Sequence, residues 1–181
     1  MLSEKQKEEL LALAKTTLSS HILGKPLAPF SNPDPVFHQK VGAFVTLHNQ
    51  GELRGCIGMM ESHSPLFETI IQMTKAASTK DPRFVSVSEN ELGEIDIEIS
   101  VLTPRKKINS IEEIEVGKHG LWIEKGFHKG VLLPQVANEQ NWDREKFLSH
   151  TCVKAGLHPD EWKKENTTIM IFEALVFGEK N

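Results

Sequence analysis

The spacing of apolar residues predicts three helices. Ser3 and Gln6 resemble a capping box, and the apolar residues after them recur at helical spacing, which predicts an amphipathic helix over residues 3–22. A second apolar stripe of the same period covers residues 66–77, and a third helix is predicted from Asp143 to Ala155.

Strand signals fill much of the remaining chain. Ile95–Val101 alternates strictly between apolar and polar residues, which is typical of a strand with one buried face. Asn49-Gln50-Gly51 separates two strand-like segments and predicts a β-hairpin. The other predicted strands are residues 41–47, 52–58, 121–124, 131–136 and 168–177. Because strands and helices do not alternate regularly, we predict an α+β fold with a mainly antiparallel sheet flanked by helices.

Length and composition indicate one folded domain over residues 1–181. The sequence is 39% hydrophobic and 25% charged, as in ordered globular proteins. A formal net charge of −4 disfavours nucleic-acid binding, because the only local basic runs are residues 105–107 and 163–164. Residues 25–35 carry four prolines and predict an extended surface connection without chemistry.

Targeting and cysteine patterns indicate a cytoplasmic protein. Residues 1–9 lack the apolar core of a secretory signal, and no apolar stretch is long enough to cross a membrane. Cys56 and Cys152 are the two cysteines and fit no disulfide or zinc pattern, so both are expected to be reduced. No sequence motif indicates a metal or a cofactor.

The hexapeptide Leu53–Gly58 is the main candidate for chemistry. In an extended strand, Arg54, Cys56 and Gly58 share one face. A guanidinium several ångströms from a thiol favours the thiolate, so Cys56 is a candidate nucleophile with Arg54 as its cation. Gly55 and Gly58 are candidate ligand-binding positions, because glycine permits close approach of a ligand or of another backbone. The alternative is purely architectural, since free cysteine is often a small buried hydrophobe.

A cysteine nucleophile usually needs a base, and spacing alone does not choose one. We favour His119, because Gly117-Lys118-His119-Gly120 predicts a flexible polar turn before a strand, although a solvated loop histidine is the alternative. The other histidines considered as the base are His63, His128, His150 and His158.

Two further groups are candidate ligand contacts. Asp96 and Glu98 share a strand face and could form an acid–base pair or bind a hard cation, or they could simply be the exposed side of a half-buried strand. Gln135 belongs to a polar cluster that either rims a ligand site or begins a helix. Arg83 could pair with an acid or a ligand, and surface ion pairing is the favoured interpretation.

Six sequence blocks, taken together, have the order and residues of one known family. They are Gly42–Leu47, Leu53–Gly58, Asp81–Phe84, Ser100–Pro104, Gly117–Gly120, and Leu133–Ala137 followed by Glu139-Gln140 and Trp142-Asp143. With these blocks the chain resembles the AMMECR-one family, also called AmmeMemoRadiSam system protein A. Only Val85-Ser86-Val87 departs, because it lacks a proline that we associate with this segment.

The resemblance implies an α+β fold with a larger lobe, a smaller β-rich lobe and a cleft near residues 53–58. It also implies a pathway shared with a Memo-type protein and a radical S-adenosylmethionine enzyme. It supplies no catalytic residues. Two functions therefore stay open, namely an enzyme that acts through Cys56 on a small molecule or protein group, and a non-enzymatic interaction partner or scaffold in that system.

Overall fold

The computed structural model describes residues 2–179 and divides the chain into two compact units. Unit 1 comprises Met1–Leu102 and Leu175–Asn181, and unit 2 comprises Thr103–Ala174. The final strand, β7 (Thr168–Gly178), contributes its first residues to unit 2 and its last residues to unit 1. Each unit has its own cluster of buried apolar residues.

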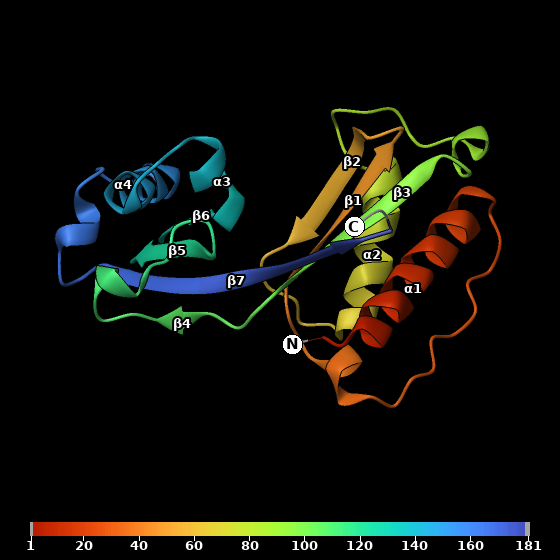
Figure 1. The fold of residues 1–181 in the computed structure, drawn as a ribbon, viewed down its shortest axis with the longest axis horizontal. Helices are drawn as coiled ribbons and strands as arrows, with labels where there is room; N and C mark the ends of the chain where they lie inside the picture. Colours follow the sequence, from red (N-terminus) through yellow and green to blue (C-terminus); the bar gives the residue numbers. More distant parts are fainter. Residues whose placement is uncertain (1, 180–181) are drawn as a thin grey trace. The chain divides into compact units, whose positions relative to one another are not determined.

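Unit 1 is a layer of two helices against an antiparallel sheet (Figure 1). The strands lie in the order β2, β1, β3, with β7 next to β3. Ser3 caps the first helix through the predicted capping box with Gln6. The elements are α1 (Glu4–Ile22), the short 3-10 helix η1 (Pro35–His38), β1 (Ala43–Asn49), β2 (Glu52–Met59), α2 (Leu66–Thr79), the 3-10 helix η2 (Glu89–Glu91) and β3 (Ile95–Leu102).

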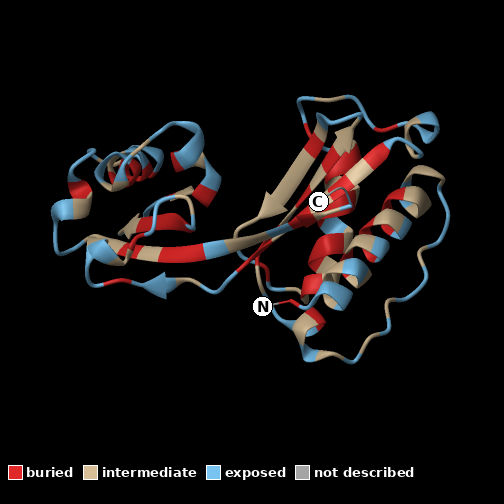
Figure 2. Cartoon of the chain, in the orientation of Figure 1, coloured by how far each residue is buried: buried red, intermediate tan, exposed pale blue. Residues whose placement is uncertain are grey.

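The helices of unit 1 cover one face of its sheet. Leu18 of α1, Ile70 of α2, and Val45 and Ile97 of the sheet belong to the same buried cluster. Figure 2 shows buried positions on the strands and on the helices, while other positions of both helices are exposed. Alternate residues of the strands, which point to the opposite face, are half-buried.

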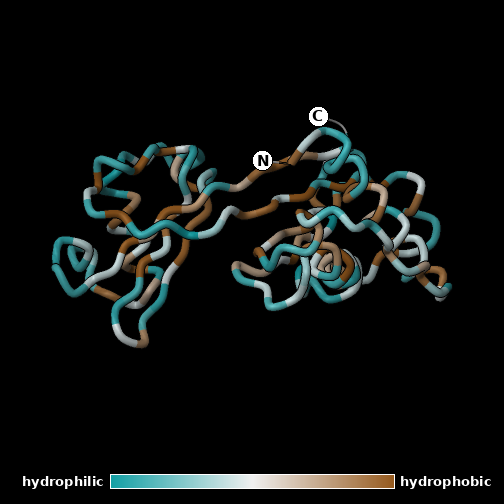
Figure 3. Tube along the Cα trace, turned by 90° about the horizontal axis from the view of Figure 1, so that it is seen from below, coloured by the Kyte–Doolittle hydropathy of each residue, from teal (hydrophilic) through white to brown (hydrophobic). Residues whose placement is uncertain are grey.

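Unit 2 packs two helices on a second antiparallel sheet. Its strand order is β6, β5, β7, and β4 also pairs with β7. In both units, hydrophobic stretches of the trace are interrupted by hydrophilic loops (Figure 3). The elements are β4 (Lys106–Lys107), η3 (Ile111–Glu113), β5 (His119–Lys125), β6 (His128–Leu132), α3 (Pro134–Glu139), α4 (Arg144–Lys154) and η4 (Glu161–Lys163).

The α+β class and the antiparallel pairing predicted from the sequence are confirmed, and one element boundary is wrong. The strand predicted over residues 131–136 ends at Leu132, and Pro134 begins α3. Proline has no amide proton for a strand ladder, and its fixed φ suits the first position of a helix.

Gly55 lets β2 lie directly against α2. A Cβ atom at Gly55 would lie 2.2 Å from the carbonyl oxygen of Ala77, whereas one at Gly93 would meet no atom within 4 Å. We expect Gly55→Ala to lower the free energy of unfolding by about 1–3 kcal/mol, because the helix must shift. Gly93→Ala is the control and should change it by less than about 0.5 kcal/mol. Equal urea midpoints for the two variants, measured by circular dichroism, would contradict this packing.

Candidate functional site

Three polar side chains form one row across the sheet of unit 1. Cys56 on β2 pairs with Thr46 on β1, and Thr46 pairs with Glu98 on β3. All three are half-buried, while residues beside them in sequence, such as Gly55 and Leu47, are buried toward α2. The row therefore lies on the sheet face opposite α2, with neighbouring Cβ atoms about 5 Å apart.

Cys56 is held by hydrogen bonds from its side chain and its backbone. The Thr46 hydroxyl donates to Sγ at 3.2 Å. The backbone N–H of Cys56 points out from the edge strand and donates to Oδ2 of Asp81 at 2.9 Å. The sulfur thus has a fixed position and a hydroxyl donor.

Asp81 joins Cys56 to Arg83. Asp81 is 4% exposed, and its two oxygens accept from Nε of Arg83 at 2.9 Å and from Nη2 at 2.7 Å. The hydrogen bond from Arg83 is the main cause that lowers the pKa of Asp81 far below its usual value, and the Cys56 N–H lowers that pKa further. The carboxylate is therefore ionised and fixed at neutral pH.

The guanidinium of Arg83 is held by Asp81, the residue that also binds the backbone N–H of Cys56. The Arg83 side chain is 54% exposed. The hydrogen bond with Asp81 is the largest cause that raises the pKa of Arg83, and the charge of Cys56 is among the smaller ones. Arg83 therefore carries a partly exposed positive charge within electrostatic range of Cys56.

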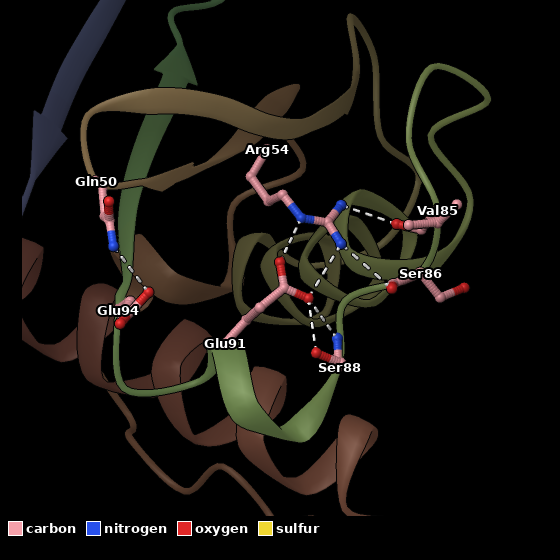
Figure 4. Close-up of polar contacts among 7 residues, drawn as sticks. All are labelled: Gln50, Arg54, Val85, Ser86, Ser88, Glu91 and Glu94. Carbon is pink, nitrogen blue, oxygen red and sulfur yellow. Dashed lines mark hydrogen bonds and ion pairs between the residues drawn. The ribbon is translucent and has the colours of Figure 1, made fainter.

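Arg54 does not follow the strict alternation predicted for β2. Leu47 pairs with Gly55 and His48 pairs with Leu53, so Arg54 is the extra residue of a β-bulge. Figure 4 shows its guanidinium turned toward the loop before η2.

Arg54 anchors this loop, and each of its three guanidinium nitrogens donates to a protein group. Nε donates to Glu91 at 2.6 Å, and Nη1 and Nη2 donate to the carbonyl oxygens of Val85 and Ser86 at 2.8 and 3.2 Å (Figure 4). The hydrogen bond from Arg54 is the main cause that lowers the pKa of Glu91 to about 2. The cation predicted beside Cys56 is therefore a structural anchor, and Arg83 is instead joined to the Cys56 backbone through Asp81.

Both candidate glycines contact the protein itself. Gly55 lies against the backbone of α2. At Gly58 a Cβ atom would lie 2.1 Å from the ring of Phe44, so this ring covers the glycine on the cysteine face of the sheet. The sequence allowed these glycines either to approach a ligand or to have a purely architectural role. The structure shows a close approach to another backbone at Gly55 and packing against an aromatic ring at Gly58.

The remaining candidates lie in several places. Glu98 joins the cysteine row, and Asp96 is paired across the sheet with His48. His119 and Gln135 belong to unit 2. The turn predicted before β5 is present at residues 116–118, but the exposure predicted for His119 is wrong, because His119 begins β5 and is 7% exposed. Gln135 is exposed on α3. The other histidines considered as the base are exposed, namely His63, His128, His150 and His158.

Sequence reasoning missed Thr46 and the role of Asp81. The two-residue spacing of Asp81 and Arg83 was an available signal, whereas Thr46 faces Cys56 only because of the bulge at Arg54. Within residues 2–179, no helix has both the length and the apolar character needed to cross a membrane. The same residues contain no cluster of three or more acidic, histidine or cysteine side chains suited to a metal ion. Both cysteines are free thiols.

Comparisons with known proteins point to one family. The AMMECR1 family model matches residues 11–177. Protein MJ0810 of Methanocaldococcus jannaschii is 44% identical over 92% of this chain and 86% of its own length, and Protein Mbar_A1807 of Methanosarcina barkeri is 43% identical over 99% and 93%. The crystal structure of PH0010, an uncharacterized protein of Pyrococcus horikoshii, superposes on this chain with a TM-score of 0.83 at 38% sequence identity. The match covers 99% of this chain and 94% of the PH0010 chain.

The Arg54–Glu91 pair makes stability depend on pH. Because the pKa of Glu91 falls from 4.5 to about 2 on folding, its stabilising effect is complete above pH 4.5 and is lost as the pH falls through 2. We expect Glu91→Gln to lower the free energy of unfolding by about 1–3 kcal/mol at pH 7. The difference in the free energy of unfolding between the wild type and Glu91→Gln should become smaller as the pH falls from about 5 to 2. Urea unfolding at several pH values measures it.

Glu94→Gln is the matched control, because Glu94 accepts a hydrogen bond from the amide of Gln50 in the same region (Figure 4). It should change stability little at any pH. If the difference in the free energy of unfolding between the wild type and Glu91→Gln stays constant with pH, the assignment of Arg54 as an anchor is contradicted.

Proposed function

We propose that this chain, which belongs to the AMMECR1 family, is a thiol-dependent enzyme whose nucleophile is Cys56. The observation that carries the proposal is the row Cys56–Thr46–Glu98 in unit 1, with Arg83 held by Asp81, which also binds the backbone N–H of Cys56. The row supplies a nucleophile, a hydroxyl donor and a carboxylate on one sheet face. Arg83 adds a positive charge. These are the group types that covalent cysteine chemistry uses.

Each group has a distinct part in the proposed chemistry. The sulfur of Cys56 forms a bond to an electrophilic carbon of a small molecule or of a protein, and the bond from that carbon to its leaving group breaks. The Thr46 hydroxyl donates to the sulfur, and Glu98, next in the row, takes the thiol proton and returns a proton to the leaving group. Arg83 attracts an anionic part of the substrate, because Asp81 occupies Nε and Nη2 while more than half of the side chain is exposed.

The setting of this chemistry is also a proposal. The family resemblance supports a shared pathway with a Memo-type protein and a radical S-adenosylmethionine enzyme. The free state of both cysteines supports a reducing compartment such as the cytoplasm. The cleft near residues 53–58 stays a prediction.

Alkylation of Cys56 tests this proposal. We expect Cys56 to react with iodoacetamide faster than Cys152, because Cys152 is buried and burial raises the pKa of its thiol. We also expect Arg83 to favour the anionic reagent iodoacetate. Arg83→Gln should therefore lower the ratio of the iodoacetate rate to the iodoacetamide rate by roughly threefold to tenfold. Mass spectrometry of the alkylated peptides measures both rates.

Two control variants make the result specific. Lys80→Gln removes an exposed positive charge directly before Asp81 in the sequence. It should leave the ratio of the iodoacetate rate to the iodoacetamide rate unchanged. Cys56→Ser should abolish the fast labelling. Slow labelling of Cys56 in the folded protein, or an unchanged ratio in Arg83→Gln, would count against a nucleophilic Cys56 assisted by Arg83.

A second candidate function is that of a non-enzymatic interaction partner, and the loop held by Arg54 favours it. Val85 in this loop is 83% exposed, although the loop is anchored through the carbonyl oxygens of Val85 and Ser86. A fixed apolar side chain suits docking to a protein. Two results together would favour this function over the enzyme. Cys56 would be inert to alkylation, and the wild type, but not Val85→Asp, would capture the Memo-type protein or the radical S-adenosylmethionine enzyme.

A further inference from the structure

Unit 2 contains a cavity of about 400 Å³ at the beginning of β5. This volume lies in the range of small-molecule sites, about 300–1,000 Å³. The residues relevant to ligand chemistry are Thr103, Pro104, His119, Ile171, Phe172 and Glu173. All of them belong to unit 2, so the cavity is independent of the cysteine row and of the function proposed for it.

His119 presents a fixed donor to this cavity. Its Nδ1 accepts the backbone N–H of Glu115 at 3.0 Å, so the ring is neutral and carries its proton on Nε2. The side chain is 9% exposed, and Nε2 lies 3.7 Å from Oε1 of Glu173. That distance is too long for a hydrogen bond. Within residues 2–179, no protein acceptor therefore lies within hydrogen-bond distance of this N–H, which faces the cavity.

Glu173 presents an acceptor next to that donor. Its Oε1 is 3.7 Å from Nε2 of His119 and 3.8 Å from Nζ of Lys118, so neither contact is a hydrogen bond. The backbone N–H of Glu173 donates to the hydroxyl oxygen of Thr103 at 2.8 Å, which leaves the proton of that hydroxyl available. Glu113, by contrast, is occupied by Lys106 at 2.9 Å.

We propose that this cavity binds a small neutral compound with several hydroxyl groups, such as a sugar or a polyol. A hydroxyl group placed between Nε2 and Oε1 accepts the proton of His119 and donates its own proton to Glu173. A second hydroxyl can accept from Thr103. The apolar residues Pro104 and Ile171 supply a surface for the C–H groups of such a ligand.

The same groups disfavour charged ligands. An ammonium group is attracted by Glu173 but has no lone pair to accept the His119 N–H. A carboxylate or phosphate accepts from His119 but is repelled by Glu173, while the nearby lysines are paired, Lys106 with Glu113 and Lys118 with Glu115. A hydroxyl group satisfies the donor and the acceptor together.

Nuclear magnetic resonance of the full chain tests the site. Ribose, glucose and myo-inositol are titrated separately while the ring nitrogens of His119 are followed, and propylamine and acetate serve as charged probes. We expect at least one of the three polyols to shift the His119 Nε2 resonance saturably, and neither charged probe to do so. Glu173→Gln should weaken the binding by about tenfold, because it removes the charged acceptor.

Glu139→Gln is the matched control, because Glu139 is an exposed residue of α3 outside the cavity lining. It should leave the affinity unchanged, and the amide spectrum of each variant checks its fold. A saturable shift by propylamine or acetate without one by a polyol would overturn the ligand class. No saturable shift with any of the probes, or equal affinities for Glu173→Gln and the wild type, would overturn the site.

Discussion

The buried carboxylate of Asp81 connects the edge of the sheet to the loop that follows α2. It accepts the outward N–H of Cys56 and both the Nε and Nη2 donors of Arg83. An edge strand normally leaves such N–H groups unpaired, which invites pairing with another chain. Here an ionised side chain takes the position of a neighbouring strand. The same carboxylate thus joins the backbone of Cys56 to the guanidinium of Arg83.

A second arginine completes this arrangement from the other end of the loop. Arg54 leaves the regular strand at the β-bulge and binds Glu91 and the carbonyl oxygens of the loop. The two arginines thus have different tasks, because Arg54 is largely buried among acceptors whereas Arg83 is more than half exposed. Fixed groups that need no reorganisation on binding favour both catalysis and docking.

Much of the fold was predictable from the sequence, because period and capping are local signals. The alternation of Ile95–Val101 and the Ser3–Gln6 capping box give the strand and the helix that the structure shows. The site was less predictable, because it depends on register. Nothing near Arg54 in sequence indicates that Leu47 faces Gly55, and one extra residue turned Arg54 away from the predicted row. His119 was misplaced because its burial arises from packing within unit 2.

Amide hydrogen exchange at Cys56 measures the role of Asp81 directly. In the wild type we expect the Cys56 amide to exchange slowly, although it lies at the outer edge of the sheet. In Asp81→Ala it should exchange at least about tenfold faster, relative to the amides of the central strand β1, because its acceptor is gone. Equal protection of the Cys56 amide in the two proteins would contradict the claim that Asp81 holds the edge strand and positions the thiol.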